Sequence, residues 1–190
     1  MTATTIRRAK PDDAAALASL AKRTFQDTFG TEDNLADMAL YCTESFSAEV
    51  QRQEILDENY VTLLAEVEGQ LVAFAQVRLQ SPKDCVSAAY ASKTCPSELY
   101  RLYVAKVWHG QGVAQAVMAE VVAVAAQAGV DCLWLGVWEH NPRAIAFYRK
   151  CGFTVVGEHI FQFGSDSQRD LVMLRAMDKG LNPSNETVFN

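Results

Sequence analysis

The stretch "RLYVAKVWHGQGVA", residues 101–114, decides the fold class of this chain. It begins as an apolar strand, turns through two glycines separated by one residue, and continues into an alanine- and valine-rich helix. Two nucleotide-binding patterns do not fit it. The dinucleotide fingerprint needs a third glycine, and a P-loop needs a lysine and then Ser or Thr, where this chain has Val113 and Ala114. What remains is a strand, a turn and a helix whose free backbone N–H groups can bind an anion.

The pattern on either side of this stretch predicts alternating strands and helices. We expect strands over 4–10, 60–67, 70–80, 97–105, 132–138, 153–163 and 169–177, with helices from Pro11 to 29, over 112–128 and over 141–152. Residues 31–59 look helical or irregular, and 81–96 look like a loop because they contain two prolines and no periodicity. This order predicts one α/β (α+β) domain over residues 4–177, with a mixed, mostly antiparallel sheet of six to seven strands flanked by helices. Residues 178–190 are expected to be a polar tail.

Composition excludes several classes of function. The net charge of −6 argues against nucleic acid and is compatible with a cationic substrate. No apolar run is long enough to span a bilayer, and the N-terminus lacks the apolar core of a signal peptide. The five cysteines are odd in number and lack metal-ligand spacing. We therefore expect a cytoplasmic protein that binds no metal, no nucleic acid and no membrane.

The stretch 101–114 resembles the acetyl-CoA-binding motif of the GNAT superfamily of N-acyltransferases. In that motif a strand leads into Gln/Arg-x-x-Gly-x-Gly/Ala, matched here by "HGQGVA" (109–114). The second signature of the superfamily is a strand, an Asn-led helix ending in Tyr, and then Gly-Phe, and "LWLGVWEHNPRAIAFYRKCGF" (133–153) matches it. The resemblance implies a single-domain GNAT fold that uses acetyl-CoA as cosubstrate and a small-molecule amine as acceptor. Within the superfamily, "RLYV", "AIAFYRKCGF" and "RTFQDTFG" are most similar to the PaiA-type spermidine/spermine acetyltransferases.

The same resemblance implies a set of cosubstrate-binding residues. They are Leu102, Tyr103, Val104, His109, Gly110, Gln111, Gly112, Val113, Ala114 and Asn141. The backbone of Leu102 and Val104 is expected to pair with the pantetheine arm like an added strand. Asn141 also suits the cap of the next helix, and that role alone would explain it. His109 departs from the motif, because a neutral imidazole donates one hydrogen bond but brings no charge; it could equally be a surface histidine.

Two residues are candidates for the chemistry of acetyl transfer. A lysine-like amine with a pKa near 10.4 is protonated at pH 7, and removing that proton costs roughly 4.6 kcal/mol. Glu98, at the place where relatives that acetylate histone lysines carry a general base, is the candidate proton acceptor, although it could be a solvated edge glutamate. Strand alternation predicts that Glu98, Tyr100, Leu102 and Val104 share one face. By resemblance, Tyr148 protonates the leaving thiolate; the alternative is a core tyrosine.

The acceptor and the assembly are less constrained by the sequence. The acids between Asp27 and Glu49 could line a groove for a polyamine, or they could be a solvated helix face. A GNAT enzyme acting on a protein or amino-acid amine is an alternative, as is a catalytically weak module that senses acetyl-CoA. The apolar "HIFQFG" (159–164) could pair across a homodimer or lie at a covered sheet edge.

Overall fold

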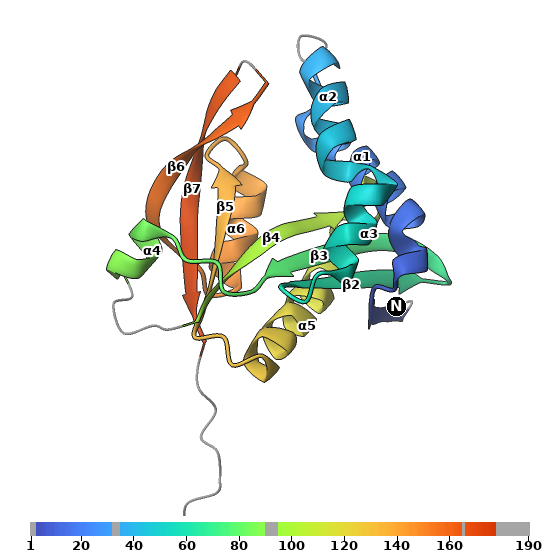
Figure 1. The fold of residues 1–190 in the computed structure, drawn as a ribbon. Coiled ribbons are helices and arrows are strands. Elements are labelled where there is room, and N and C mark those ends of the chain that lie inside the picture. Colours follow the sequence, from blue (N-terminus) through green and yellow to red (C-terminus); the bar gives the residue numbers. More distant parts are fainter. Residues whose placement is uncertain (1–2, 32–34, 90–94, 165, 178–190) are drawn as a thin grey trace, which may run out of the picture.

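The computed structural model describes residues 3–31, 35–89, 95–164 and 166–177. Its strands form one sheet in the order β1-β2-β3-β4-β5-β7-β6, in which only β4 and β5 are parallel neighbours (Figure 1). The strands are β1 Thr4–Arg8, β2 Tyr60–Val67, β3 Gln70–Arg78, β4 Pro96–Val104, β5 Cys132–Trp138, β6 Thr154–Phe163 and β7 Asp166–Ala176. The helices are α1 Ala14–Phe29, α2 Leu35–Phe46, α3 Ala48–Leu56, α4 Asp84–Ala89, α5 Val113–Gln127 and α6 Pro142–Lys150, with short 3-10 turns at Pro11–Asp13 and Lys106–Trp108. The predicted mixed, mostly antiparallel sheet flanked by helices is confirmed.

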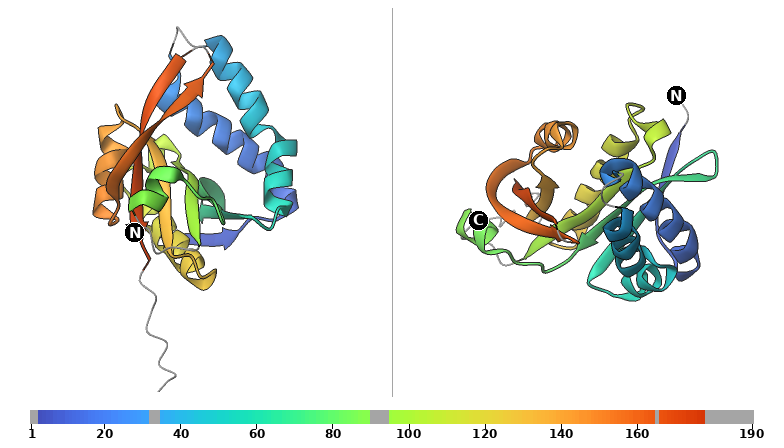
Figure 2. Two further views of the ribbon diagram at one scale, coloured as in Figure 1. Left: turned by 60° about the vertical axis from the view of Figure 1, so that its left-hand side comes forward. Right: turned by 90° about the horizontal axis from the view of Figure 1, so that it is seen from above.

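Helices cover both faces of the sheet (Figure 2). On one face, α5 packs against β1–β4 through Val117, Val121 and Ala125, which fall four residues apart and are fully buried. On the other face, α1 and α2 bury a second core around Leu17, Phe25 and other aromatic side chains. The sheet therefore separates two apolar cores, and anything bound at a gap between strands can touch both.

A buried charge fixes α3 to the second face. The guanidinium of Arg101 on β4 is 5% exposed and lies 2.6 Å from the Glu54 carboxylate on α3. The same group donates to the side-chain oxygen of Gln76 on β3 at 2.7 Å. Because burying one charge without its partner is strongly unfavourable, this pair holds α3 in a single position against β3 and β4.

The expectation of a loop over 81–96 is wrong for Asp84–Ala89, which form the short helix α4. Val86 of α4 is 1% exposed and packs against Trp134 and Cys132 of β5. The helix thus depends on a contact with a distant strand, which local periodicity does not reveal. Residues 90–94 and the predicted tail lie outside the described residues.

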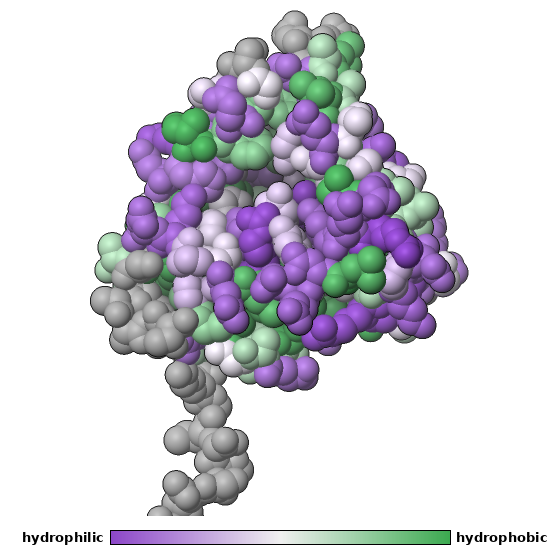
Figure 3. All heavy atoms as spheres, in the orientation of Figure 1, coloured by the Kyte–Doolittle hydropathy of each residue, from purple (hydrophilic) through white to green (hydrophobic). Residues whose placement is uncertain are grey.

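Of the helices in the described ranges, none is long and apolar enough to cross a membrane. The face seen in Figure 3 is mainly hydrophilic, with apolar side chains in small separate groups. Strand β6, where the sequence suggested a dimer contact, lies at the edge of the sheet and exposes Ile160.

Candidate active site

A fork between the two parallel strands opens the centre of the sheet. Strand β4 pairs with β5 only through Pro96–Glu98 and Cys132–Trp134, after which the strands diverge. A cavity of about 520 Å³ lies at this fork, and it reaches between α1, α2 and the β6–β7 hairpin. Beyond the fork, the edge of β4 therefore has no strand pairing with it on this side, as the expected pairing with pantetheine requires.

The glycine turn lies at one end of this cavity. Gly110 and Gly112 have φ values of +77° and +85°, which L side chains rarely adopt, and both line the cavity. A Cβ added to either residue would meet nothing within 4 Å, so the turn leaves open space beside its backbone. The first helical hydrogen bond of α5 runs from the Ala116 amide to the Gly112 carbonyl, at 3.0 Å. The preceding N–H groups of the helix thus have no partner within it and can receive an anion.

Two of the predicted cosubstrate residues turn their side chains away from the cavity. The Gln111 amide donates to the Val107 carbonyl at 2.8 Å, and the Val113 side chain is buried in the core beneath α5. Only the backbone of these two residues remains for a ligand. The other predicted residues of this set line the cavity: Leu102, Tyr103, Val104, His109, Gly110, Gly112, Ala114 and Asn141.

His109 connects the end of β4 to the start of α6. Its Nδ1 lies 2.8 Å from Nη1 of Arg143, and its Nε2 lies 2.8 Å from the Val104 carbonyl oxygen. A guanidinium can only donate, so Nδ1 accepts and Nε2 carries the proton that it donates to Val104. This arrangement requires a neutral imidazole. It also holds the positive charge of Arg143, an exposed residue of the first turn of α6, beside the glycine turn.

Tyr148 lines the cavity from α6. The helix begins at Asn141, whose side chain accepts from the Ala144 amide at 3.1 Å. Two turns later the Tyr148 ring packs against Phe147 and Phe153, with ring centroids 5.4 and 5.8 Å away. Burial raises the pKa of the Tyr148 hydroxyl above its ordinary value, so the group keeps its proton at neutral pH.

Glu98 lines the deep end of the cavity, near the point where β4 and β5 separate. Its carboxylate lies 3.2 Å from the Arg78 guanidinium and accepts from the Ser81 hydroxyl at 3.3 Å. Burial raises the pKa of Glu98, and the nearby Arg78 opposes that effect. The raised pKa brings the carboxyl closer to the range in which it can accept a proton at neutral pH.

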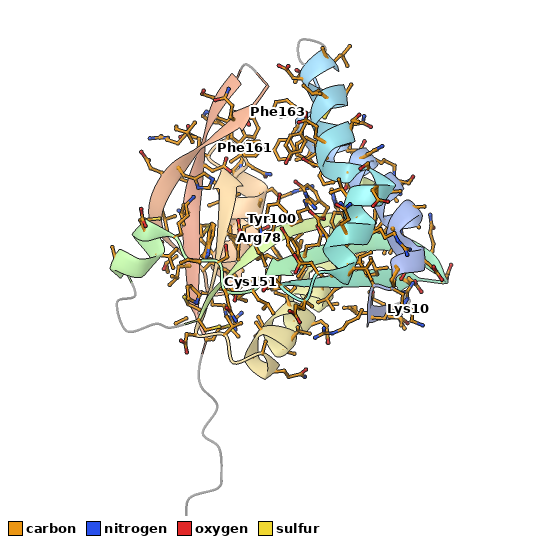
Figure 4. The ribbon with its side chains drawn as sticks, viewed as in Figure 1. Lys10, Arg78, Tyr100, Cys151, Phe161 and Phe163 are labelled. Carbon is orange, nitrogen blue, oxygen red and sulfur yellow. The ribbon has the colours of Figure 1, made fainter. Side chains whose placement is uncertain are left out.

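The prediction that Glu98, Tyr100, Leu102 and Val104 share one face is wrong. Strand β3 pairs Gln76 with Arg101 and Val77 with Leu99, so Tyr100 is an extra residue in β4. The bulge shifts the alternation by one residue. Before it, the side chains of Glu98 and Tyr100 face the side of α3, where Arg78 lies 4.0 Å from the Tyr100 ring centroid (Figure 4). After it, Leu102 and Val104 pack against the core beneath α5.

The other end of the cavity is an acceptor lobe between α1, α2 and the β6–β7 hairpin. Aromatic rings form its walls, and Phe161 and Phe163 point from β6 towards α2 (Figure 4). The aromatic residues lining this lobe are Phe25, Phe29, Tyr41, Trp138, Phe161 and Phe163. Of the acidic residues that the structure describes between Asp27 and Glu49, none lines the cavity. The polyamine groove that the sequence suggested along these acids is therefore not part of this cavity.

Two titratable residues on the floor of the acceptor lobe were missed by sequence reasoning. Asp170 on β7 pairs in register with His159 on β6 and with Trp138 on β5. The carboxylate Oδ2 of Asp170 lies 4.0 Å from Nε2 of His159, and burial raises the pKa of Asp170 to about 6. Gly136 leaves room for both, since a Cβ there would come within 2.9 Å of the His159 ring. A glycine inside an otherwise apolar strand was the one available signal in the sequence.

A profile of the acetyltransferase (GNAT) family matches residues 16–153. An uncharacterised N-acetyltransferase from Mycobacterium bovis is 31% identical over 165 residues, which cover 87% of this chain and 98% of that protein. The aminoglycoside N(6′)-acetyltransferase type 1 of Stenotrophomonas maltophilia is 33% identical over 152 residues, which cover 80% of this chain and 86% of that protein.

Solved structures share the fold at lower identity. The PaiA N-acetyltransferase from Thermoplasma acidophilum, solved with coenzyme A, has a TM-score of 0.71 at 20% identity, covering 92% of this chain and 99% of that one. The ribosomal-protein-S18-alanine N-acetyltransferase from Escherichia coli has a TM-score of 0.66 at 17% identity, covering 99% of this chain and 100% of that one.

Proposed function

The chain belongs to the acetyltransferase (GNAT) family and is an acetyl-CoA-dependent N-acetyltransferase, and we propose that its acceptor is a polyamine such as spermidine or spermine. The observation that carries the proposal is the single cavity that joins the glycine turn, Tyr148 and two carboxylates, Glu98 near the fork and Asp170 in the acceptor lobe. Such a cavity lets both substrates bind at once, so the amine can attack the thioester directly in a ternary complex. A module that only sensed acetyl-CoA would need neither a lobe for an acceptor nor a phenol at the fork.

The donor half supplies the groups that a diphosphate and an amide-containing arm require. The open turn at Gly110 and Gly112 and the free N–H groups of α5 would receive the diphosphate. Arg143, held by His109, would supply the positive charge that an arginine at the position of His109 brings in other versions of the motif. The unpaired edge of β4 would bind the arm through its backbone, with Asn141 beside it.

Tyr148 and Glu98 would carry the two proton transfers. Glu98 accepts a proton from the ammonium form of the acceptor, and the neutral nitrogen then forms its bond to the acetyl carbonyl carbon. The carbon–sulfur bond breaks, and the thiolate takes a proton from the Tyr148 hydroxyl. The second nitrogen proton reaches the Tyr148 phenolate through water and restores the phenol, and Glu98 releases its proton to solvent. Glu98 must accept a proton at neutral pH, and Tyr148 must hold one that it can donate. The raised pKa values of the two groups suit these roles.

A thiol-release assay with acetyl-CoA and a panel of amines tests the proposal. The panel contains spermidine, spermine, an aminoglycoside, free amino acids and a peptide with a free N-terminus. We expect the highest kcat/KM with a polyamine, and Glu98→Gln should lower kcat by about 10²-fold for every acceptor that is turned over. A preference for the peptide or the aminoglycoside would contradict the polyamine assignment, and full activity of E98Q at every pH would remove Glu98 from the chemistry.

A further inference from the structure

We propose that Asp170 is the binding site for a second cationic nitrogen of the acceptor, distinct from the nitrogen that is acetylated. This inference rests on the proposed function and narrows the substrate class to amines with at least two positive charges. It starts from a difference between the two carboxylates of the cavity, Glu98 near the fork and Asp170 in the acceptor lobe. Glu98 has an arginine within ion-pair distance, whereas Asp170 has only the imidazole of His159 at 4.0 Å within the part of the chain that the structure describes.

The surroundings of Asp170 leave its negative charge without a close cation. Burial lowers the pKa of His159, so the imidazole is neutral at pH 7 and does not offset the carboxylate. Among the described residues, the other cation that acts on Asp170 is Lys83, whose ammonium lies 5.3 Å from the centroid of the Trp134 ring and acts on Asp170 only through space. A carboxylate that is partly buried and lacks an ion-pair partner gains most from a cation supplied by a ligand.

The sheet register gives the spacing of the two carboxylates. Glu98 pairs with Trp134, and Asp170 pairs with Trp138, four residues further along β5. Four residues span roughly 13 Å along β5, and β4 and β7 lie on opposite sides of that strand, so the two carboxylates are separated on the scale of an extended polyamine. One amine at the Glu98 end can therefore react at the fork while a second nitrogen of the same molecule reaches Asp170.

The walls of the lobe suit the rest of such a molecule. Trp138 pairs with Asp170 across the strands, and its ring lies 6.1 Å from that of Phe29 and 5.5 Å from that of His140. Aromatic faces attract ammonium groups and also bury the methylene segments between them. Charged groups at fixed positions and apolar segments between them are the chemistry of a linear polyamine.

Asp170→Asn tests the inference without changing the size of the side chain. KM and kcat are measured with spermidine and with an alkyl monoamine of the same length, and calorimetry measures the binding of spermidine independently of turnover. We expect KM and Kd for spermidine to rise at least about 10-fold, while KM for the monoamine changes less than about two-fold and kcat stays within about two-fold for both. Asp27→Asn is the matched control, since Asp27 is exposed on α1 and does not line the cavity.

Two results would overturn the inference: an equal change with both amines, or unchanged binding of spermidine. If the wild type transferred no acetyl group to any amine, the proposed function would fall, and the calorimetry would still decide whether Asp170 binds a polyamine. Thermal unfolding confirms that the variant folds. Asp170→Glu is a second test of the inference. It moves the carboxylate inward by one methylene, so the enzyme should then prefer polyamines with a shorter spacing between nitrogens.

Discussion

The donor half and the acceptor half of the cavity are built in different ways. The donor half consists mainly of backbone: the turn at Gly110 and Gly112, the first N–H groups of α5 and the open edge of β4. The acceptor half consists of side chains that come from α1, α2 and four strands, with Asp170 and His159 among its polar groups. A shared cosubstrate can be bound by backbone geometry that a short motif encodes. An acceptor is recognised by side chains that only the completed sheet brings together.

Removing the phenol at the boundary between the halves should have the largest effect. Tyr148→Phe is expected to lower kcat by about 10²-fold or more, because the leaving thiolate loses its proton donor. KM for both substrates and the midpoint of thermal unfolding should change little, since the ring contacts with Phe147 and Phe153 remain. Steady-state kinetics with a thiol reagent measures this. If the variant kept full kcat, Tyr148 would only line the cavity and would not be the proton donor.

Adding one methyl group to the glycine turn tests whether the donor half depends on its backbone. Gly112→Ala should raise KM for acetyl-CoA by about 10-fold and lower the free energy of unfolding by about 1–2 kcal/mol, because φ is +85°. Gly129→Ala is the control, since Gly129 also has a positive φ, of +70°, and open space around it but lies away from the cavity. It should lose similar stability and keep its KM. A similar KM in the two variants would show that the diphosphate binds elsewhere.

The one charged side chain assigned to the donor half should matter less than its backbone. Arg143→Ala is expected to raise KM for acetyl-CoA about five-fold, and the dependence of KM on salt should become shallower because an attraction has been lost. Arg149→Ala, which removes an exposed arginine of the same helix outside the cavity, should leave KM unchanged. If both variants behaved alike, the bond between Arg143 and His109 would serve only to hold α6 against β4.

A pH titration tests the acceptor half of the cavity, and its expected effect is the smallest. The raised pKa of Asp170, about 6, means that its carboxylate is ionised above that pH and protonated below it. The ratio of kcat/KM for spermidine to that for a matched monoamine should therefore rise a few-fold as pH increases through about 6. Glu98 acts on both amines alike, so its titration cancels in the ratio.

His159 and Lys83 also face Asp170 in this pH range. Burial lowers the pKa of His159, and loss of its proton with rising pH would favour a bound cation in the same direction, so the Asp170 variant is needed to separate the two groups. Asp170→Asn should give a flat ratio. A slope that persisted in that variant would assign the titration to another group.

The sequence predicted the strands and the turn at Gly110 and Gly112 well because both depend on local patterns. Alternation and apolar runs located every strand, although β7 begins at Asp166, before the predicted start. The helix α4 was missed because Val86 is held by a distant strand, and the bulge at Tyr100 was missed because it is a property of the pairing between β3 and β4. The site at Asp170 depends on the register of β5, β6 and β7, which no short motif records.

The bulge at Tyr100 has a consequence for how such an enzyme can change its substrate over evolutionary time. By shifting the alternation within β4, it assigns Glu98 and Tyr100 to one side of the sheet and Leu102 and Val104 to the other. Mutations at Tyr100 can explore new acceptors while Glu98 keeps its proposed role and Leu102 and Val104 keep their packing. A library at Tyr100 should therefore yield many folded variants of altered selectivity, and one at Leu102 and Val104 few.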